Sequence, residues 1–135
     1  MSARVVISDE TSTGKVLHEL TLELLSPSIT VRDLIELRVR DEVARFNAKN
    51  GPDVFRGLVQ PTDAEATLNA YEYRVSARRK PIDPEEQCQR AWHAFEANGF
   101  LLLVGDRQAE RLDEKLTITP DLRVSFVKLV PLVGG

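Results

Sequence analysis

The residues most suited to chemistry lie at the end of the sequence. The chain finishes in Gly134 and Gly135, which follow an apolar, strand-like run over residues 124–133. Glycine lacks a Cβ, so a diglycine segment is narrow enough to enter a partner's channel and takes extended or positive-φ conformations without strain. Two such glycines arise by chance in roughly one chain in 200, because glycine is about 7% of average sequences. We therefore weigh a reactive Gly135 carboxylate against a frayed terminus.

The four residues before the glycines fit the first interpretation. We expect Val130, Pro131, Leu132 and Val133 to hold the segment extended for entry into a partner's active site. Proline fixes φ and removes a hydrogen-bond donor from the end of a strand, so Pro131 also suits a plain strand terminator. We expect residues 131–135 to form a flexible C-terminal tail.

The other reactive side chains predict no catalytic centre. Cys88 is the single cysteine, and its helical stripe with Trp92 and Phe95 is typical of an inert, packed thiol. His18 and His93 are far apart in sequence and have no evident serine, cysteine or carboxylate partner, so we expect no metal site. We predict that the chain is not an enzyme and binds no cofactor.

Size and charge limit the remaining functions. The 135 residues, 42% apolar and 29% charged, suit a single soluble domain spanning 1–135. A net charge of −3 argues against nucleic-acid binding, which needs a basic surface. No stretch approaches the roughly 18 apolar residues of a membrane span, and the apolar start is too short for a secretory signal. We therefore expect a cytoplasmic protein without membrane contact.

The first elements predicted are two strands. Residues 4–8 form a β-branched run, and residues 15–25 alternate apolar and polar side chains with period 2. Residues 9–14, ending in Ser12, Thr13 and Gly14, have the composition of a turn between them. We expect a β-hairpin.

Two helices have clear start signals. Thr30 is placed as an N-cap with Asp33 three residues later, which predicts a helix over 30–49 that Asn50-Gly51-Pro52 ends. Asp83-Pro84 opens a second helix that Asn98-Gly99 closes. Between them we expect a short helix at 62–70 and a strand at 71–75.

The C-terminal third returns to β structure. Residues 100–104 form an apolar run before a Gly105-Asp106 turn, a polar connection follows, and residues 122–130 form a last strand buried between neighbours. The predicted fold class is α+β, a mixed sheet of the hairpin and last strands packed on one main helix.

Several of these segments together resemble the ubiquitin-like β-grasp superfamily. They are the hairpin, the helix that begins Thr30-Val31-Arg32-Asp33-Leu34, the run FLLLVGDRQAERLDEKLTI at 100–118, and LRVSFVKLVPLVGG at 122–135. The end of the chain looks closest to the sulfur carriers of molybdopterin and thiamine synthesis. Residues 51–98, which contain the second helix, form an insertion, and an enlarged β-grasp protein looks more like bacterial ubiquitin-like modifiers.

The resemblance implies that Gly135 is activated by an ATP-dependent adenylating enzyme, so ATP is used by the partner and not bound here. A modifier would then pass through thioesters on a conjugating enzyme to lysines of target proteins, and an isopeptidase would release it. A sulfur carrier would instead receive a Gly135 thiocarboxylate. A non-covalent β-grasp binding module is the third alternative, and in it the glycines would have no role.

Overall fold

The computed structural model describes residues 3–48, 54–55, 58–59, 73–74 and 81–129. The chain divides into two compact units, one of residues Met1–Leu34 and Ala94–Gly135 and one of Ile35–His93. We call them the sheet unit and the helical unit. Within the described residues the chain has an α+β architecture with a mixed five-stranded sheet and two helices, as the sequence predicts at that level.

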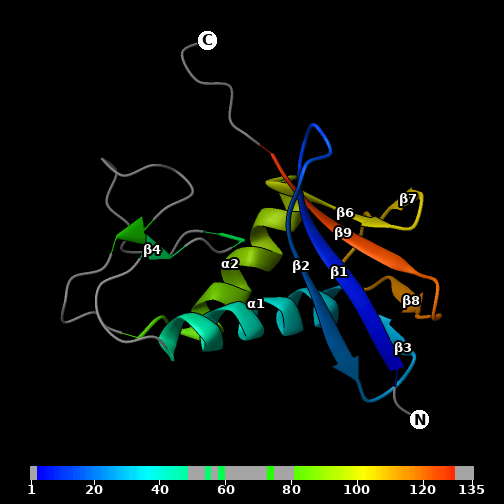
Figure 1. Cartoon of the computed structure of the whole chain (residues 1–135), viewed down its shortest axis with the longest axis horizontal. Helices are drawn as coiled ribbons and strands as arrows, with labels where there is room; N and C mark the ends of the chain where they lie inside the picture. The colour runs from blue at the N-terminus through cyan, green and yellow to red at the C-terminus, as the bar shows by residue number, and fades with distance from the viewer. Residues whose placement is uncertain (1–2, 49–53, 56–57, 60–72, 75–80, 130–135) are drawn as a thin grey trace. The chain divides into compact units, whose positions relative to one another are not determined.

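The sheet unit is built on five strands in the order β2-β1-β9-β6-β7, which Figure 1 shows side by side. Their bounds are β1 (Ala3–Thr11), β2 (Val16–Leu24), β6 (Phe100–Val104), β7 (Arg107–Gln108) and β9 (Arg123–Lys128). Strand β1 is parallel to β9, and the other neighbours are antiparallel. The prediction that the hairpin and the last strand share one sheet is confirmed.

One face of this sheet carries most of the buried apolar side chains. Alternation places apolar residues of four strands on it, because successive side chains of a strand point to opposite faces. The buried residues are Val5, Ile7, Leu20, Leu22, Leu24, Phe100, Leu102, Val124 and Phe126. Phe100 lies between Phe95 and Phe126, with ring centroids 6.0 Å from each. Burial of these side chains fixes the sheet's register.

The predicted turn at 9–14 is too long. Strand β1 continues to Thr11, and the turn is closed by hydrogen bonds from Thr11 N to Lys15 O and from Gly14 N to Thr11 O, both 2.9 Å. Gly14 has φ of 91°, a conformation that glycine takes without strain. Polar residues at 9 and 10 suggested a turn, but they pair with β2 at the end of the sheet, where the register shifts around Leu17.

The connection after β6 contains more structure than the sequence suggested. The Gly105 turn is present, with Gly105 N donating to Arg123 O at 2.8 Å and a φ of 61°. Beyond it come β7 and then β8 (Lys115–Thr117), which pairs with β3 (Ser28–Thr30) in a separate two-stranded sheet. The sequence predicts a polar connection without strands over this range, which is wrong. Its strands are too short for a periodic pattern to reveal.

The first turn of α1 (Val31–Asn47) is fully capped. Thr30 Oγ1 accepts the Asp33 N–H at 3.1 Å, which confirms the predicted N-cap. Val31 N and Arg32 N donate to the carbonyls of Glu114 and Leu112, both at 2.9 Å. The connection before β8 therefore satisfies helix donors that would otherwise need solvent.

The helical unit contains most of α1 and of α2 (Pro84–Glu96), with the short pair β4 (Val54–Phe55) and β5 (Tyr73–Arg74). Asp83 caps α2 as predicted, accepting the Glu85 N–H at 3.0 Å. The Asn47 side chain accepts the Ile82 N–H at 2.8 Å and donates to the Ile82 carbonyl at 2.9 Å. This pair of bonds fixes the approach to α2 against the end of α1. The predicted helix at 62–70 and the stop at 50–52 lie outside the described residues.

The C-terminus of α2 also follows its sequence signal. Asn98 N donates to Phe95 O at 3.1 Å and Gly99 N donates to Ala94 O at 2.7 Å. The left-handed residue is Asn98, with φ of 60°, and not the glycine. Asparagine tolerates this conformation better than other non-glycine residues, so it ends the helix.

Candidate functional site

The residues predicted to carry the function lie outside the described part of the chain. These are Gly134 and Gly135, together with the segment Val130, Pro131, Leu132 and Val133. The structure describes the strand that precedes them, which ends at Lys128, and one further residue, Leu129. The candidate site is therefore built from β9 and its neighbours.

Strand β9 is the middle strand of the sheet. Its Lys128 is opposite Thr11 of the parallel strand β1 on one side and Phe100 of β6 on the other. The side chains of Val124 and Phe126 have no exposed surface. Strand β9 is thus held by hydrogen-bonded neighbours along both edges, as well as by the core, up to the residue where the described strand ends.

A polar cluster occupies the opposite face of the same strands. The Ser8 hydroxyl donates to Glu10 Oε2 at 2.7 Å, and the Ser8 and Ser125 hydroxyl oxygens are 3.2 Å apart. Ser8 is only 6% exposed, and Glu10 is half-buried. Ser8 and Ser125 are direct partners in the parallel ladder between β1 and β9. We call Ser8, Glu10 and Ser125 the serine–glutamate cluster.

This cluster favours the ionised form of Glu10. Hydrogen bonding by Ser125, and then by Ser8, holds the pKa of the Glu10 carboxyl below its ordinary value, with a smaller contribution from the positive charge of Arg123. No lysine, arginine or histidine of the described residues lies within ion-pair distance of Glu10. The carboxylate is stabilised by hydroxyl groups and has no cation beside it in this part of the chain.

Apolar side chains flank Glu10 along one row of the sheet. Val16 of β2 pairs with Glu10, Glu10 pairs with Val127, and Val127 pairs with Leu101 of β6. Paired residues of neighbouring strands lie on the same face, so these four form a row that crosses four strands. We call it the Glu10 row. Val16 is 54% exposed, and the next residue, Leu17, is 50% exposed.

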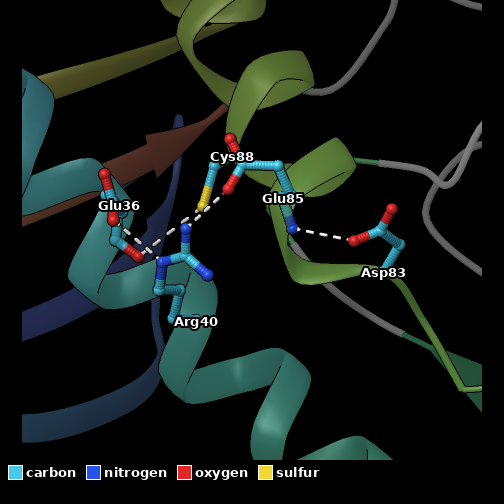
Figure 2. A network of polar contacts seen from close by, with 5 residues as sticks. All are labelled: Glu36, Arg40, Asp83, Glu85 and Cys88. Atoms are coloured by element: carbon cyan, nitrogen blue, oxygen red, sulfur yellow. Dashed lines mark hydrogen bonds and ion pairs between the residues drawn. The ribbon is translucent and has the colours of Figure 1, made fainter.

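The helical unit has a different polar arrangement, which Figure 2 shows from close by. The Arg40 guanidinium donates through Nε to Glu36 and through Nη2 to Glu85, both at 2.8 Å. These two hydrogen bonds raise the pKa of Arg40 above its already high ordinary value. The two carboxylates compensate the cation within the unit, so this network serves to connect α1 with α2.

Cys88 lies beside this network and is buried. Its Sγ is 3.9 Å from the carbonyl of Glu36, and burial raises the pKa of the thiol to about 11. The thiolate is the nucleophilic form, so a thiol with this pKa is inert near neutral pH. The burial predicted for this residue is confirmed. His18 and His93 are both exposed.

Sequence reasoning missed the serine–glutamate cluster. Ser8 and Glu10 follow Val5 and Ile7 in alternation, which is a signal that β1 has one polar face. Ser125 interrupts the apolar strand in the same way. The sequence does not reveal that these positions are neighbours, because the two serines are 117 residues apart and meet only through the parallel register.

Comparison with known proteins identifies no relative of this chain. No family model, curated protein or solved structure matches the chain. Within the part of the chain that the structure describes, no helix is long and apolar enough to cross a membrane. The resemblance to β-grasp proteins therefore rests on the sequence segments and remains a prediction.

Proposed function

We propose that this chain is a ubiquitin-like modifier of β-grasp fold whose Gly135 carboxylate is joined to amines of other proteins. The observation that carries the proposal is the position of β9. The strand leading to Gly134 and Gly135 is the middle strand of a mixed sheet, paired with β1 and β6. A strand paired along both edges gives the sequence that follows it an ordered starting point, which supports presentation of the terminal carboxylate to a separate enzyme.

The arrangement of the sheet gives further support. Three of the segments that resemble β-grasp proteins, the β1–β2 hairpin, β6 with its Gly105 turn, and β9, are neighbours in a single sheet. The fourth, the Thr30-capped helix, begins directly after β3. Three of the four similar segments thus lie together in one sheet, and the fourth begins in the same unit with the first turn of α1.

The proposed reaction begins at the α-phosphorus of ATP. The Gly135 carboxylate attacks it, pyrophosphate leaves, and an acyl-adenylate forms. A cysteine thiolate of the activating enzyme then displaces AMP to form a thioester, which passes to a conjugating enzyme. A target lysine amine finally displaces the thiolate and forms an isopeptide bond. The partner enzymes supply the acid, base and nucleophile in each step, and this chain is the acyl donor.

Reconstitution tests this function. The chain is incubated with ATP and with candidate activating enzymes from its own genome, and products are separated with and without a reducing agent. We expect an ATP-dependent adduct that the reducing agent cleaves, and none with a variant lacking Gly134 and Gly135. An adduct that forms equally well without the two glycines would overturn the proposal.

Two alternative functions would give different results in related measurements. A sulfur carrier would show an oxygen-to-sulfur exchange at Gly135 in the intact mass, with no adduct to lysine. A binding module would keep its partner when Gly134 and Gly135 are deleted. Either result would replace the modifier function, and neither requires a change in the described fold.

A further inference from the structure

We propose that the activating enzyme binds this chain through the side chains of Val16 and Leu17 as well as through Gly135. We call these two residues the bulge pair. In the complex they pack against an apolar surface beside the enzyme's adenylation site. This inference rests on the proposed function and deepens it, because it names the surface of the folded chain that the partner contacts.

The bulge pair is an exposed apolar patch on an ordered strand. Val16 is 54% exposed and Leu17 is 50% exposed. Successive side chains of a regular strand point to opposite faces, so two neighbours on a half-buried strand do not ordinarily share one exposed surface. Both residues lie in β2, the edge strand of the five-stranded sheet.

A β-bulge places both side chains on the same face. The register between β1 and β2 shifts between Asp9 and Glu10, and Leu17 is the extra residue without a partner on β1. Val16 pairs with Glu10, so it lies on the face of the serine–glutamate cluster. Leu17 shares that face because it alternates with Glu19, the partner of a cluster residue. Bulges of this kind redirect side chains at sheet edges and beside functional sites.

The bulge pair lies at the end of the sheet from which β9 leads to the terminal glycines. Strand β9 ends at Lys128, which is opposite Thr11, the last residue of β1. Figure 1 shows the β1–β2 turn and the end of β9 at this same end of the sheet. In the Glu10 row only Glu10 separates Val16 from Val127, so Val16 is two strand spacings, roughly 10 Å, from β9. An enzyme that holds the residues after β9 therefore comes within reach of the bulge pair.

The chemistry of the chain end explains why the enzyme needs a second contact. Two glycines have no side chains, so they distinguish this chain poorly from any other with the same ending. Contacts remote from the reacting carboxylate supply the binding energy that holds it in place. An apolar partner surface gains by covering the bulge pair, because both side chains lose their remaining contact with water.

The test is ATP–pyrophosphate exchange by the activating enzyme that forms the adduct described above, measured against the concentration of the full chain. For the double variant Val16→Ser and Leu17→Ser, we expect the half-saturating concentration to rise about tenfold. The maximal rate should not change, because the lost contact is the same in the ground state and the transition state.

Two matched variants separate this contact from a general effect of apolar surface. Val16→Ile with Leu17→Met keeps the patch apolar and should keep the half-saturating concentration of the original chain. Leu25→Ser removes a side chain that is 95% exposed but follows the opposite end of β2, so it should also have no effect. Leu17→Ser alone breaks no strand pair and should raise the half-saturating concentration about threefold, which covers the case of a misfolded double variant.

The possible failures are distinguishable. No exchange with the original chain and any candidate enzyme would overturn the proposed function and this inference together. Exchange that is normal for the serine variants, or reduced equally by Leu25→Ser, would overturn this inference alone. Sedimentation of the chain by itself gives a further outcome. A dimer that the serine variants abolish would show that a second copy covers the bulge pair, and would also overturn the inference.

Discussion

The two units hold their carboxylates in different ways. In the helical unit, Glu36 and Glu85 bracket the Arg40 guanidinium, so anion and cation compensate each other within the fold. In the sheet unit, Glu10 is held by the hydroxyls of Ser8 and Ser125. The Arg40 network is stabilised by opposite charges, whereas the ionised form of Glu10 is stabilised mainly by neutral hydroxyl donors. Substitutions in the two units should therefore affect stability through different interactions, ion pairs in the helical unit and hydroxyl hydrogen bonds in the sheet unit.

A buried ion pair of the helical unit provides the sharpest test of this contrast. The side chains of Arg38 and Glu42 form an ion pair at 3% and 16% exposure, and Glu42 Oε1 also accepts the Leu58 N–H at 3.0 Å. Arg38→Met removes the cation and leaves the largely buried Glu42 carboxylate without this partner. We expect the free energy of unfolding to fall by roughly 3–5 kcal/mol. Urea unfolding followed by fluorescence of Trp92, the single tryptophan, measures the change.

The matched control for that substitution is Arg45→Met. Arg45 also pairs along α1, with Asp41 at 3.1 Å, but the two side chains are 56% and 30% exposed. Exposed helix pairs contribute about 0.3–0.5 kcal/mol, so this variant should unfold almost like the original chain. Similar losses for the two variants would show that the compensation of buried charge is not what stabilises the helical unit.

The reactivity of Cys88 gives the next largest effect. With a pKa of about 11 in place of 9.0, the thiolate fraction near pH 8 falls by roughly a hundredfold. We expect the folded chain to react with an aromatic disulfide reagent at least that much more slowly than the same chain unfolded in urea. A native thiol that reacts as fast as the unfolded one would contradict the burial described for α2.

Ser125→Ala tests the serine–glutamate cluster with a smaller effect. The substitution removes the hydroxyl that contributes most to lowering the pKa of Glu10. The pKa should rise toward its ordinary value, which a carboxyl-carbon NMR titration measures directly, and the free energy of unfolding should fall by about 1 kcal/mol at neutral pH. Ser12→Ala, in the exposed hairpin turn, should leave the pKa of Glu10 unchanged.

The pH dependence of stability follows from the same group and is the smallest effect. The pKa of Glu10 is lower in the folded chain than in the unfolded one. The stability that the ionised Glu10 carboxyl contributes is therefore complete at pH values above its pKa in the unfolded chain. This stability is lost as the pH falls through the pKa of the same carboxyl in the folded chain. The Ser125→Ala variant should lose less stability than the original chain over this acidic range. A steeper acid loss in the variant would show that Glu10 is not the group responsible.

Much of the fold was predictable because its boundaries have local causes. The caps at Thr30 and Asp83 depend on side chains within three residues, and the strand at 100–104 is an uninterrupted apolar run. The turn at 9–14 was misjudged, since polar composition suggested a loop where Asp9 is buried and β1 still pairs with its neighbours. Composition alone does not distinguish a turn from the polar face of a strand.

The candidate site was less predictable than the fold. The glycines stay a prediction from the sequence, because they lie outside the described residues. The serine–glutamate cluster depends on the parallel pairing of β1 with β9, which brings Ser8 to Ser125. Parallel register is set by contacts between distant segments and leaves no local pattern. The short strands β7 and β8 were missed for a similar reason, because pairing and not propensity defines them.

The most direct test of the proposed function is to detect the isopeptide bond between Gly135 and a lysine of another protein. Lys128 is followed by no other lysine or arginine, so trypsin would leave residues 129–135 attached to any modified lysine. Proteins captured under denaturing conditions with the tagged chain, from the cells that encode it, are digested and analysed by tandem mass spectrometry. The account predicts lysine peptides of other proteins that carry this remnant through Gly135. Recovery of the segment only as a free peptide, from cells in which the partner enzymes are expressed, would contradict it.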